Sequence, residues 1–423
     1  MGKYFFQLFA SSFYKLLVLF AAFSFSNLNL QAQVFNYSDG WGSQGFSIET
    51  ENASGVKLNF SIHQFEMMEK DVNGSPMKSI LIPGTFLPND EGEPDLPGVS
   101  RYIAVPQGAN VTFEIISSRT DQFTNMEIAP APRIPLDTDP GPLSYNKDLR
   151  VYDRNDFYPE SPVILSEPQN IRGVDARIVG ITPFQYNPVT KELIVYRDMK
   201  VNISFTGGNG KFGEDRLRNR WWDPMLKNIF LNYSSLPNVE YKRHSDSETE
   251  DFEYIIITPD NPDYLPWADT IKSWRTKQGI RTGIVTLTQI GGNNATLIEN
   301  YINNAYNTWD IPPVAVLFLA DYGTGGATGN GIMVPTYSGG YTTCISDNLY
   351  ADVNGDQLPD IVAGRLVAQS ASHFEIMVHK FINYEQSPPH EPYVLFETNF
   401  SRRMAVRQMV HSLCRCQLRF LAE

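Results

Sequence analysis

The hydrophobic pattern changes once along the chain, and this change constrains the fold more than any other feature. Up to about residue 205, apolar residues form short runs of β-branched and aromatic side chains, separated by Pro, Gly, Asn and Asp. After residue 251, short apolar runs alternate with amphipathic helical stretches. A chain of 423 residues also exceeds one ordinary domain of about 100–200 residues. We therefore expect an all-β unit followed by an α/β unit.

The all-β unit is predicted to be β-sandwich-like, because many short strands are separated by turn residues. The last two of its predicted strands flank the turn-rich segment 187–191 and should form a hairpin. A charged, aromatic segment, Arg216–Tyr233, is expected to form a helix beside the sheet. The clearest predicted strands are Val56–His63, Tyr102–Val105, Asn110–Ile116, Ile178–Tyr186 and Glu192–Tyr196.

A polar segment over residues 234–251 separates the two units. It contains Ser, Pro, Asp and Glu with almost no apolar periodicity, and it includes the basic pair Lys242-Arg243. Exposed linkers between compact units are preferred sites of proteolysis. We predict a boundary here with processing at Arg243; an uncut linker is the alternative.

The α/β unit is predicted to contain a mainly parallel sheet, since strands and helices alternate. Ligands of such sheets bind beyond the carboxyl ends of the strands, which directs attention to the long loop 321–359. The predicted strands are Tyr254–Thr258, Ile284–Leu287, Val314–Ala320 and Ile361–Leu366, and the predicted helices are Pro262–Gln278, Thr296–Tyr306 and Ala371–Glu385.

The N-terminus has the order of a secretory signal peptide. Lys3 and Lys15 precede an apolar run, Leu16–Phe25, and a small residue, Ala32, precedes Gln33. A membrane anchor is the alternative, but the run is about half of the ~20 residues that a span requires. We predict a signal peptide over residues 1–32, no span in the mature chain, and a periplasmic, cell-surface or extracellular location.

Charge and cysteine content exclude some partners. A net charge of −13 argues against nucleic acid, whose affinity depends on clustered Lys and Arg. Three cysteines, Cys344, Cys414 and Cys416, are too few for a disulfide framework in an exported protein of this size. Stability must therefore come from core burial.

The acidic loop, residues 352–360, is the sharpest local signal for chemistry. Oxygen-bearing side chains occupy its positions 1, 3, 5 and 9, and Ca²⁺ prefers six to eight oxygen ligands. The loop departs from an EF-hand, because its glycine is at position 4 and no Glu is at position 12. An acidic turn with Asp capping is the alternative to a Ca²⁺ site. The candidate ligands are Asp352, Asn354, Asp356 and Asp360.

Two other acidic residues belong to the long loop. Asp321 directly follows a predicted strand. The glycine-rich segment after it, residues 323–331, lacks both nucleotide-binding fingerprints, and we therefore expect a mobile loop there. Asp347 is a second carboxylate on this loop. It either binds a basic group of a substrate or is a solvated turn residue.

The sequence gives little support for a nucleophilic cysteine or for a metal site with cysteine ligands. Cys344 has no histidine nearby in sequence, although a cysteine–histidine pair requires only spatial proximity. His373 and His379 lie on an amphipathic helix and are expected to be structural. The cluster His411, Cys414 and Cys416 lacks a second half-site for a metal. No catalytic residue is therefore assigned.

Several motifs resemble the gingipain cysteine peptidases, which have a β-rich propeptide before a caspase-like α/β catalytic domain. The resemblance covers roughly residues 90–389. The motifs of the first half are Gly92–Pro97, Ile103–Ala109 and Pro183–Pro188, and those of the second are Lys277–Thr282, Ser346–Asn348, the acidic loop, Gly364–Leu366 and Ile382–Glu385.

The resemblance implies a secreted cysteine endopeptidase zymogen that acts on proteins or peptides. It implies a propeptide over residues 33–233 that covers the active-site cleft and helps the catalytic half fold, and the first part of a catalytic domain over 252–395. The family is associated with calcium, which supports the acidic loop as a Ca²⁺ site. In its arginine-specific members, an aspartate at the position resembling Asp347 lines the specificity pocket.

The family pattern is incomplete here. Its catalytic histidine lies in a His-Gly motif and its cysteine follows a later strand, yet no histidine in this chain precedes glycine. From residue 396 to 423 the chain becomes basic, which indicates translation out of frame or a foreign end; a genuine basic tail is the alternative. We expect an inactive zymogen that lacks its catalytic dyad. The alternative is a non-enzymatic secreted binding or assembly module.

Overall fold

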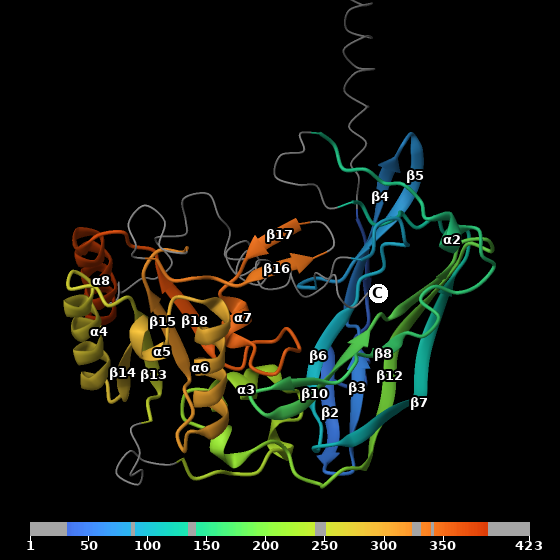
Figure 1. Ribbon diagram of the computed structural model, residues 1–423. Coiled ribbons are helices and arrows are strands. Elements are labelled where there is room, and N and C mark those ends of the chain that lie inside the picture. Colours follow the sequence, from blue (N-terminus) through green and yellow to red (C-terminus); the bar gives the residue numbers. More distant parts are fainter. Residues whose placement is uncertain are drawn as a thin grey trace, which may run out of the picture.

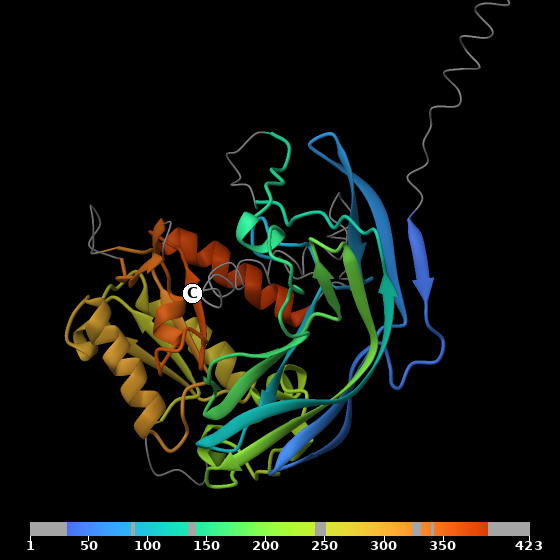
Figure 2. The same ribbon diagram turned by 90° about the vertical axis from the view of Figure 1, so that its right-hand side faces the viewer.

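The computed structural model describes residues 32–85, 89–133, 141–241, 251–323, 331–339 and 342–387. Figures 1 and 2 show a β-rich N-terminal half, residues 32–241, beside an α/β C-terminal half, residues 251–387. Within the described residues, no helix is long and apolar enough to cross a membrane.

The N-terminal half consists of antiparallel sheets, in agreement with the β-rich unit predicted from its short apolar runs and turn residues. Its longest strand, β12, pairs with three neighbours and alternates buried with less buried side chains, which is the period of a strand that has one face on a core. One sheet contains β1 (Gln33–Asn36), β4 (Gln64–Val72) and β5 (Ser75–Leu81); a second contains β6 (Val99–Ala104), β10 (Val174–Ile181), β8 (Val163–Leu165) and β9 (Gln169–Ile171); the third contains β11 (Phe184–Asn187), β12 (Glu192–Gly207), β3 (Gly55–Ser61), β2 (Gly45–Asn52) and β7 (Ala109–Phe123).

Two local predictions for this half are corrected. The strand expected over 178–186 is two strands, β10 and β11, separated at Thr182-Pro183, because proline has no N–H for a ladder. The helix expected over 216–233 is broken into the 3₁₀ turns η1 (Asp215–Leu217) and η2 (Tyr233–Ser235) around α3 (Asp223–Ile229). The Asn219 side chain accepts the N–H groups of Trp221 and Trp222, a local alternative to helical hydrogen bonding.

The predicted hairpin is confirmed. Strands β11 and β12 pair antiparallel across the turn, with Asn187 opposite Glu192. The side-chain oxygen of Asn187 accepts the N–H groups of Val189 and Thr190, which stabilises the turn.

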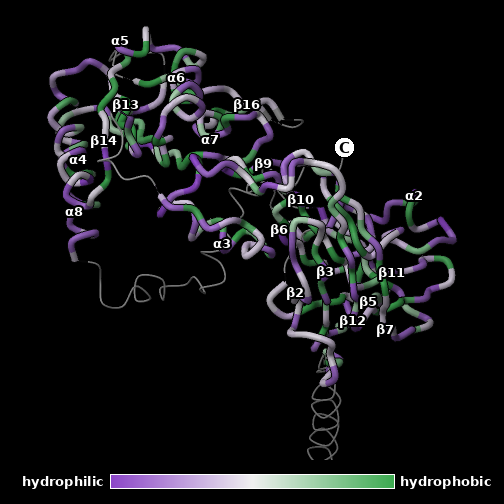
Figure 3. The backbone as a smooth tube through the Cα atoms, turned by 90° about the horizontal axis from the view of Figure 1, so that it is seen from below, coloured by the Kyte–Doolittle hydropathy of each residue, from purple (hydrophilic) through white to green (hydrophobic). Residues whose placement is uncertain are grey.

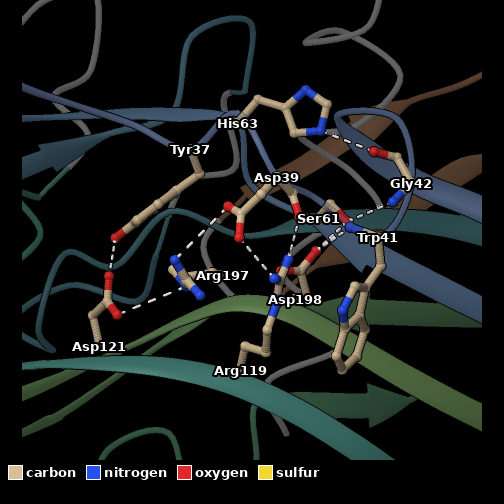
Figure 4. A network of polar contacts seen from close by, with 10 residues as sticks. All are labelled: Tyr37, Asp39, Trp41, Gly42, Ser61, His63, Arg119, Asp121, Arg197 and Asp198. Atoms are coloured by element: carbon tan, nitrogen blue, oxygen red, sulfur yellow. Dashed lines mark hydrogen bonds and ion pairs between the residues drawn. The ribbon is translucent and has the colours of Figure 1, made fainter.

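A buried carboxylate braces the N-terminal half (Figure 4). Asp198 is 1% exposed and accepts hydrogen bonds from the Ser61 hydroxyl at 2.6 Å, the Trp41 N–H at 2.7 Å and the Arg119 Nε at 2.8 Å. Arg119 also binds Asp39 at 2.9 Å. These bonds satisfy a charge that would otherwise be costly to bury.

The C-terminal half contains a parallel four-stranded sheet in the order β14-β13-β15-β18, as the alternation of strands and helices predicts. The structure adds a hairpin, β16 and β17, and a short helix, α7, inside the segment expected to be a long loop. The strands are β13 (Tyr254–Thr258), β14 (Thr282–Thr286), β15 (Ala315–Leu319), β16 (Thr336–Gly339), β17 (Thr342–Ile345) and β18 (Val362–Leu366); the helices are α4 (Leu265–Lys277), α5 (Leu287–Ile290), α6 (Ala295–Thr308), α7 (Asn348–Ala351) and α8 (Ala371–Gln386).

Helices cover the parallel sheet, with α4 beside α8 and α6 apart from them (Figure 1). The rings of Tyr264 and Phe374 meet edge to face at 4.6 Å between centroids. Near the ends of α4 and α8, Glu385 accepts hydrogen bonds from Trp274 at 2.7 Å and Arg275 at 2.8 Å. Ser370 caps the N-terminus of α8, because its hydroxyl accepts the His373 N–H.

The hydrophobic cores of the two halves interlock. Figure 3 shows hydrophobic stretches along strands of both halves, such as β3 and β13. Val314 and Leu358 of the C-terminal half pack into the core of the N-terminal half. In return, Leu217 of the N-terminal half packs into the core of the other. The contact between the halves is therefore part of the folded core.

Candidate functional site: the two edges of the parallel sheet

The parallel sheet has two edges of different chemistry. Its C-terminal edge carries Asp321, Asp347 and the side chain of Arg365, whereas its N-terminal edge is bounded by the acidic loop, residues 352–360. The strand order places a topological switch between β13 and β15, and ligands of open α/β sheets bind there, beyond the carboxyl ends.

Asp347, the predicted substrate-binding carboxylate, is held by an arginine of the same chain. The Nε of Arg365 donates to Oδ2 of Asp347 at 2.8 Å, and Nη2 donates to Oδ1 at 2.7 Å. The side chain of Arg365 is 7% exposed and that of Asp347 is 24% exposed. This bidentate pairing occupies both oxygens of the carboxylate. A basic side chain of a substrate would have to compete with Arg365 for Asp347.

Arg365 also organises the backbone at this edge. Its Nη1 donates to the carbonyl oxygens of Ala320 and Asp321, each at 3.2 Å, and its guanidinium lies 4.9 Å from the centre of the Phe318 ring. Arg365 thus connects β18, the end of β15 and the start of α7. Sequence analysis placed Arg365 in a motif and assigned it no role.

Asp321 has polar neighbours as well. Its carboxylate accepts the Tyr322 N–H at 2.8 Å and a hydrogen bond from the Gln369 side chain. Asp321 therefore lies at the expected edge of the sheet. Most of the glycine-rich segment, residues 324–330, lies outside the described residues.

Cysteine and histidine form no catalytic pair in the described part of the chain. Cys344 is a free, exposed thiol on β17. His379 packs edge to face on Trp267 at 5.5 Å between ring centroids, which agrees with its expected structural role. His411, Cys414, Cys416 and the processing residue Arg243 lie outside the described residues, as does the expected signal peptide up to residue 31.

The acidic loop folds around its own carboxylates. Asp352 accepts the N–H groups of Gly355 and Gln357, each at 2.7 Å. The amide oxygen of Asn354 accepts the Asp356 N–H at 2.9 Å. Burial raises the pKa of Asp352 above its ordinary value, although these hydrogen bonds oppose the shift. The loop is therefore a tight acidic turn, stabilised by side-chain-to-backbone bonds.

The other two carboxylates of the acidic loop bind the N-terminal half. Oδ2 of Asp356 accepts the Asn170 N–H at 2.6 Å, and Oδ1 of Asp360 accepts the Arg172 N–H at 2.9 Å. Burial raises the pKa of both carboxyls, that of Asp360 to about 6. These contacts join the loop to the β9–β10 connection of the other half.

Arg172 continues this contact with its side chain. It is 0% exposed, and its Nη1 donates to the carbonyl oxygens of Pro313 at 2.8 Å and Asp360 at 3.0 Å, while Nε donates to that of Leu217 at 3.0 Å. Burial lowers the pKa of Arg172 to about 10. Sequence analysis missed this residue, because an arginine in a turn is ordinarily exposed.

The donor types of the acidic loop suit a hard cation, but their arrangement does not fit one as it stands. Three carboxylates and an amide are ligands that Ca²⁺ accepts. In the structure, carboxylate oxygens of Asp352, Asp356 and Asp360 accept backbone N–H groups instead. No group of three or more His, Cys, Asp or Glu in metal-binding geometry occurs in the described ranges. The Ca²⁺ site remains a prediction.

Comparison with known families agrees with this architecture. The family model Propeptide_C25 matches residues 45–235, and the model of Peptidase family C25 matches residues 247–399. This chain belongs to peptidase family C25. Its two matched segments combine a C25 propeptide with part of a C25 peptidase domain, which is the arrangement of a zymogen, and the resemblance to the gingipains is confirmed.

Relatives of this C25 chain include gingipains of Porphyromonas gingivalis. Lys-gingipain HG66 is 24% identical over 340 residues, 78% of this chain and 19% of that protein. Gingipain R2 of strain ATCC BAA-308 / W83 is 23% identical over 367 residues, 85% of this chain and 45% of that protein. The chain thus spans less than half of either relative. A solved complex of the RgpB pro- and mature domains from the same species has 24% sequence identity and a TM-score of 0.40, covering 44% of this chain and 97% of that one.

Proposed function

We propose that this chain serves as the propeptide and the first part of the catalytic domain of an exported, gingipain-like cysteine endopeptidase zymogen. The observation that carries the proposal is the joined pair of family matches, a C25 propeptide followed by a C25 peptidase segment. Proteins or peptides are the proposed substrates. The signal-like N-terminus, residues 1–32, supports export to the periplasm, the cell surface or beyond.

We further propose that these 423 residues alone have no peptidase activity. Cysteine peptidases require a thiolate that attacks the scissile carbonyl and a histidine that transfers protons. Cys344 is exposed, and no hydrogen bond to a histidine is present for it among the described residues. The test is hydrolysis of peptidyl-arginine and peptidyl-lysine amides by the purified chain. Turnover abolished by Cys344→Ala would overturn the proposal.

The non-enzymatic binding module remains the competing function, and gene sequencing separates the two. The gene would be sequenced from the codon of Tyr384 onward and translated in all three frames. A frame that continues with a His-Gly motif and a later cysteine after an apolar strand supports the zymogen. A confirmed stop after Glu423 followed by no such frame favours the binding module.

Processing at Arg243 is part of the zymogen proposal. Treatment of the purified chain with a trypsin-like protease at low concentration should produce two fragments that meet near this residue, because exposed linkers are cut first. Mass spectrometry of the fragments identifies the bond. Cleavage that persists unchanged in the double variant Lys242→Gln, Arg243→Gln would contradict this assignment.

Calcium binding by the acidic loop is a separate proposal, supported by its donor types. A bound cation would have to displace the N–H groups that the carboxylates now accept. The test is thermal unfolding in 1 mM EGTA against excess Ca²⁺, with Asp352→Asn as the variant, because ligands that bind the folded state raise the melting temperature. Equal melting temperatures with and without Ca²⁺ would exclude the site.

A further inference from the structure

The turn that carries Arg172 has an unusual backbone. Strands β9 and β10 are joined by only two residues, Arg172 and Gly173, with φ angles of 52° and 77°. Two successive positive φ values are typical of a type I′ hairpin turn, whose first position usually holds Asn, Asp or Gly. Arginine there is uncommon and carries a conformational cost. Such a residue points to a role for its side chain.

Gly173, at the second position of the turn, lies close to Leu217. A Cβ atom on Gly173 would lie 2.3 Å from Cδ1 of Leu217. Leu217 also accepts the Arg172 Nε with its carbonyl oxygen and packs in the core of the C-terminal half. The turn is therefore seated against a residue that already belongs to the opposite core.

The side chain of Arg172 is enclosed by groups from both halves. Its guanidinium lies 5.4 Å from the ring centre of Trp222 and 4.9 Å from that of Tyr306. The carbonyl oxygens of Pro313 and Asp360 accept from Nη1. Pro313 precedes β15 and Asp360 precedes β18, so the arginine binds the N-terminal edge of the parallel sheet. This is the edge opposite to Asp347.

Two cavities, of about 520 and 370 Å³, lie beside the turn, and both are lined by Asn170, Asp175 and Asn354. At this contact, the backbone N–H groups of Asn170 and Arg172 donate to carboxylates of the acidic loop.

Two further arginines of the N-terminal half reach the other half, but both are partly exposed. Arg216 donates to the carbonyl oxygens of Tyr306 and Trp309, with 26% of its side chain exposed, and Arg220 donates to that of Gly279, with 48% exposed. Hydrogen bonds to a charged donor are stronger where water is excluded. Arg172 is the most buried of the three donors.

We propose that the C-terminal half has a receptor for the turn Arg172-Gly173, formed by Asp356, Asp360 and the N-terminal ends of β15 and β18. Arg172 then sets how long the N-terminal half stays bound to the C-terminal half after the linker is cut. This rests on the proposed function only in assuming that the linker is processed. The occupant is the β9–β10 turn of the same chain, and the contact acts at the sheet edge opposite to Asp347 and Asp321.

The test uses the full chain with a site-specific protease sequence inserted between Arg243 and His244. After cutting, the N-terminal half is immobilised through a tag and release of the C-terminal half is followed over time. The variants are Arg172→Lys, which keeps the charge without the planar fork, and Arg172→Met. Arg216→Met is the matched control within the interface, and Arg150→Met, whose side chain is 91% exposed, is the control outside it.

The expected result is that the halves of the unchanged chain and of Arg150→Met remain together. The Arg172→Met variant should release its C-terminal half at least tenfold faster than the unchanged chain does. The release rate of Arg172→Lys should lie between these two, and Arg216→Met should change the rate by less than Arg172→Lys does. Equal release rates for Arg172→Met and Arg216→Met would overturn the proposal. Peptidase activity is not measured, so failure here is distinct from failure of the proposed function.

A second measurement guards against variants that do not fold. Hydrogen exchange of the unchanged chain is followed before and after the cut, at the amides of Asn170 and Arg172, which donate to Asp356 and Asp360. Protection of both amides should persist after cutting. Loss of this protection while the halves remain associated would show that other contacts hold them, and would overturn the role of the turn.

Discussion

Arg172 and Asp360, which are 188 residues apart in sequence, are joined twice: the Arg172 N–H donates to Oδ1 of Asp360 at 2.9 Å, and the Arg172 Nη1 donates to the Asp360 carbonyl oxygen at 3.0 Å. One residue from each half thus contributes both backbone and side chain to the contact. Because β18 begins two residues after Asp360, at Val362, this contact joins the N-terminal half to the edge of the parallel sheet.

Replacement of Arg172 should destabilise the uncut chain strongly. Arg172→Met leaves the carbonyl oxygens of Pro313 and Leu217 buried without their donor, and such losses cost about 3–5 kcal/mol in free energy of unfolding. Urea unfolding followed by tryptophan fluorescence measures the change. Arg150→Met, at an exposed position, should stay within about 0.5 kcal/mol. Similar values for the two variants would contradict the structural role.

The pairing of Asp347 with Arg365 predicts energetic coupling between them. A double-mutant cycle with Asp347→Asn and Arg365→Met should give a coupling free energy of about 2 kcal/mol, because the pair is bidentate and largely buried. The exposed pair Arg154 and Asp156 should give less than about 0.5 kcal/mol in the same cycle. A coupling of Asp347 with Arg365 that is no larger than this control would indicate a carboxylate free to bind substrate.

Asp198 should make the N-terminal half sensitive to acid. Burial alone would raise the pKa of Asp198, but hydrogen bonds from Ser61, Trp41 and Arg119 outweigh burial and lower it. A carboxyl whose pKa is lower in the folded state stabilises the fold above its unfolded pKa of about 3.9, and this stabilisation is lost as pH falls through the folded pKa.

The corresponding variant is Asp198→Asn. At pH 7 it should be less stable by about 2–4 kcal/mol, and the difference from the unchanged chain should shrink as pH falls below about 4. Urea midpoints between pH 3 and pH 7 measure this. Asp156→Asn, with 63% of the native side chain exposed, is the control. A difference in stability that grows toward low pH would contradict the predicted lowering of the Asp198 pKa in the folded state.

Modification of Cys344 should leave the fold intact. The thiol is free and exposed on β17, so alkylation should proceed in the native chain and peptide mapping should locate it. The melting temperature should change by less than about 2 °C, since surface changes rarely exceed about 0.5 kcal/mol. A large drop would place Cys344 in a packed environment, unlike the one described.

The types of element were predictable where the apolar period was strong. Strands β13 and β15 and helices α4, α6 and α8 occur within a few residues of their predicted ranges, and the parallel sheet follows from their order. The hairpin β16–β17 escaped prediction, because its segment, Thr336–Ile345, contains several Gly, Ser and Thr residues and little apolar periodicity.

The candidate site was predictable only as a set of residue types. The acidic loop and Asp347 attracted attention because carboxylates in short turns are visible in the sequence. Their partners were not visible, because Arg172 and Arg365 lie on other elements of the fold than the carboxylates they bind. No local pattern distinguishes an arginine that becomes buried from one that stays in water.

The sequence by itself determined the strand and helix periods, the polar boundary between two units and the family resemblance, because each depends on neighbours within a few residues or on short motifs. The tertiary structure alone decided that Asp347 pairs with Arg365, that Asp356 and Asp360 bind the β9–β10 turn, and that Arg172 is enclosed between the halves. Those outcomes depend on how whole elements pack against one another, which sets the distances between residues that lie 18 positions apart, as for Asp347 and Arg365, or 188 apart, as for Arg172 and Asp360.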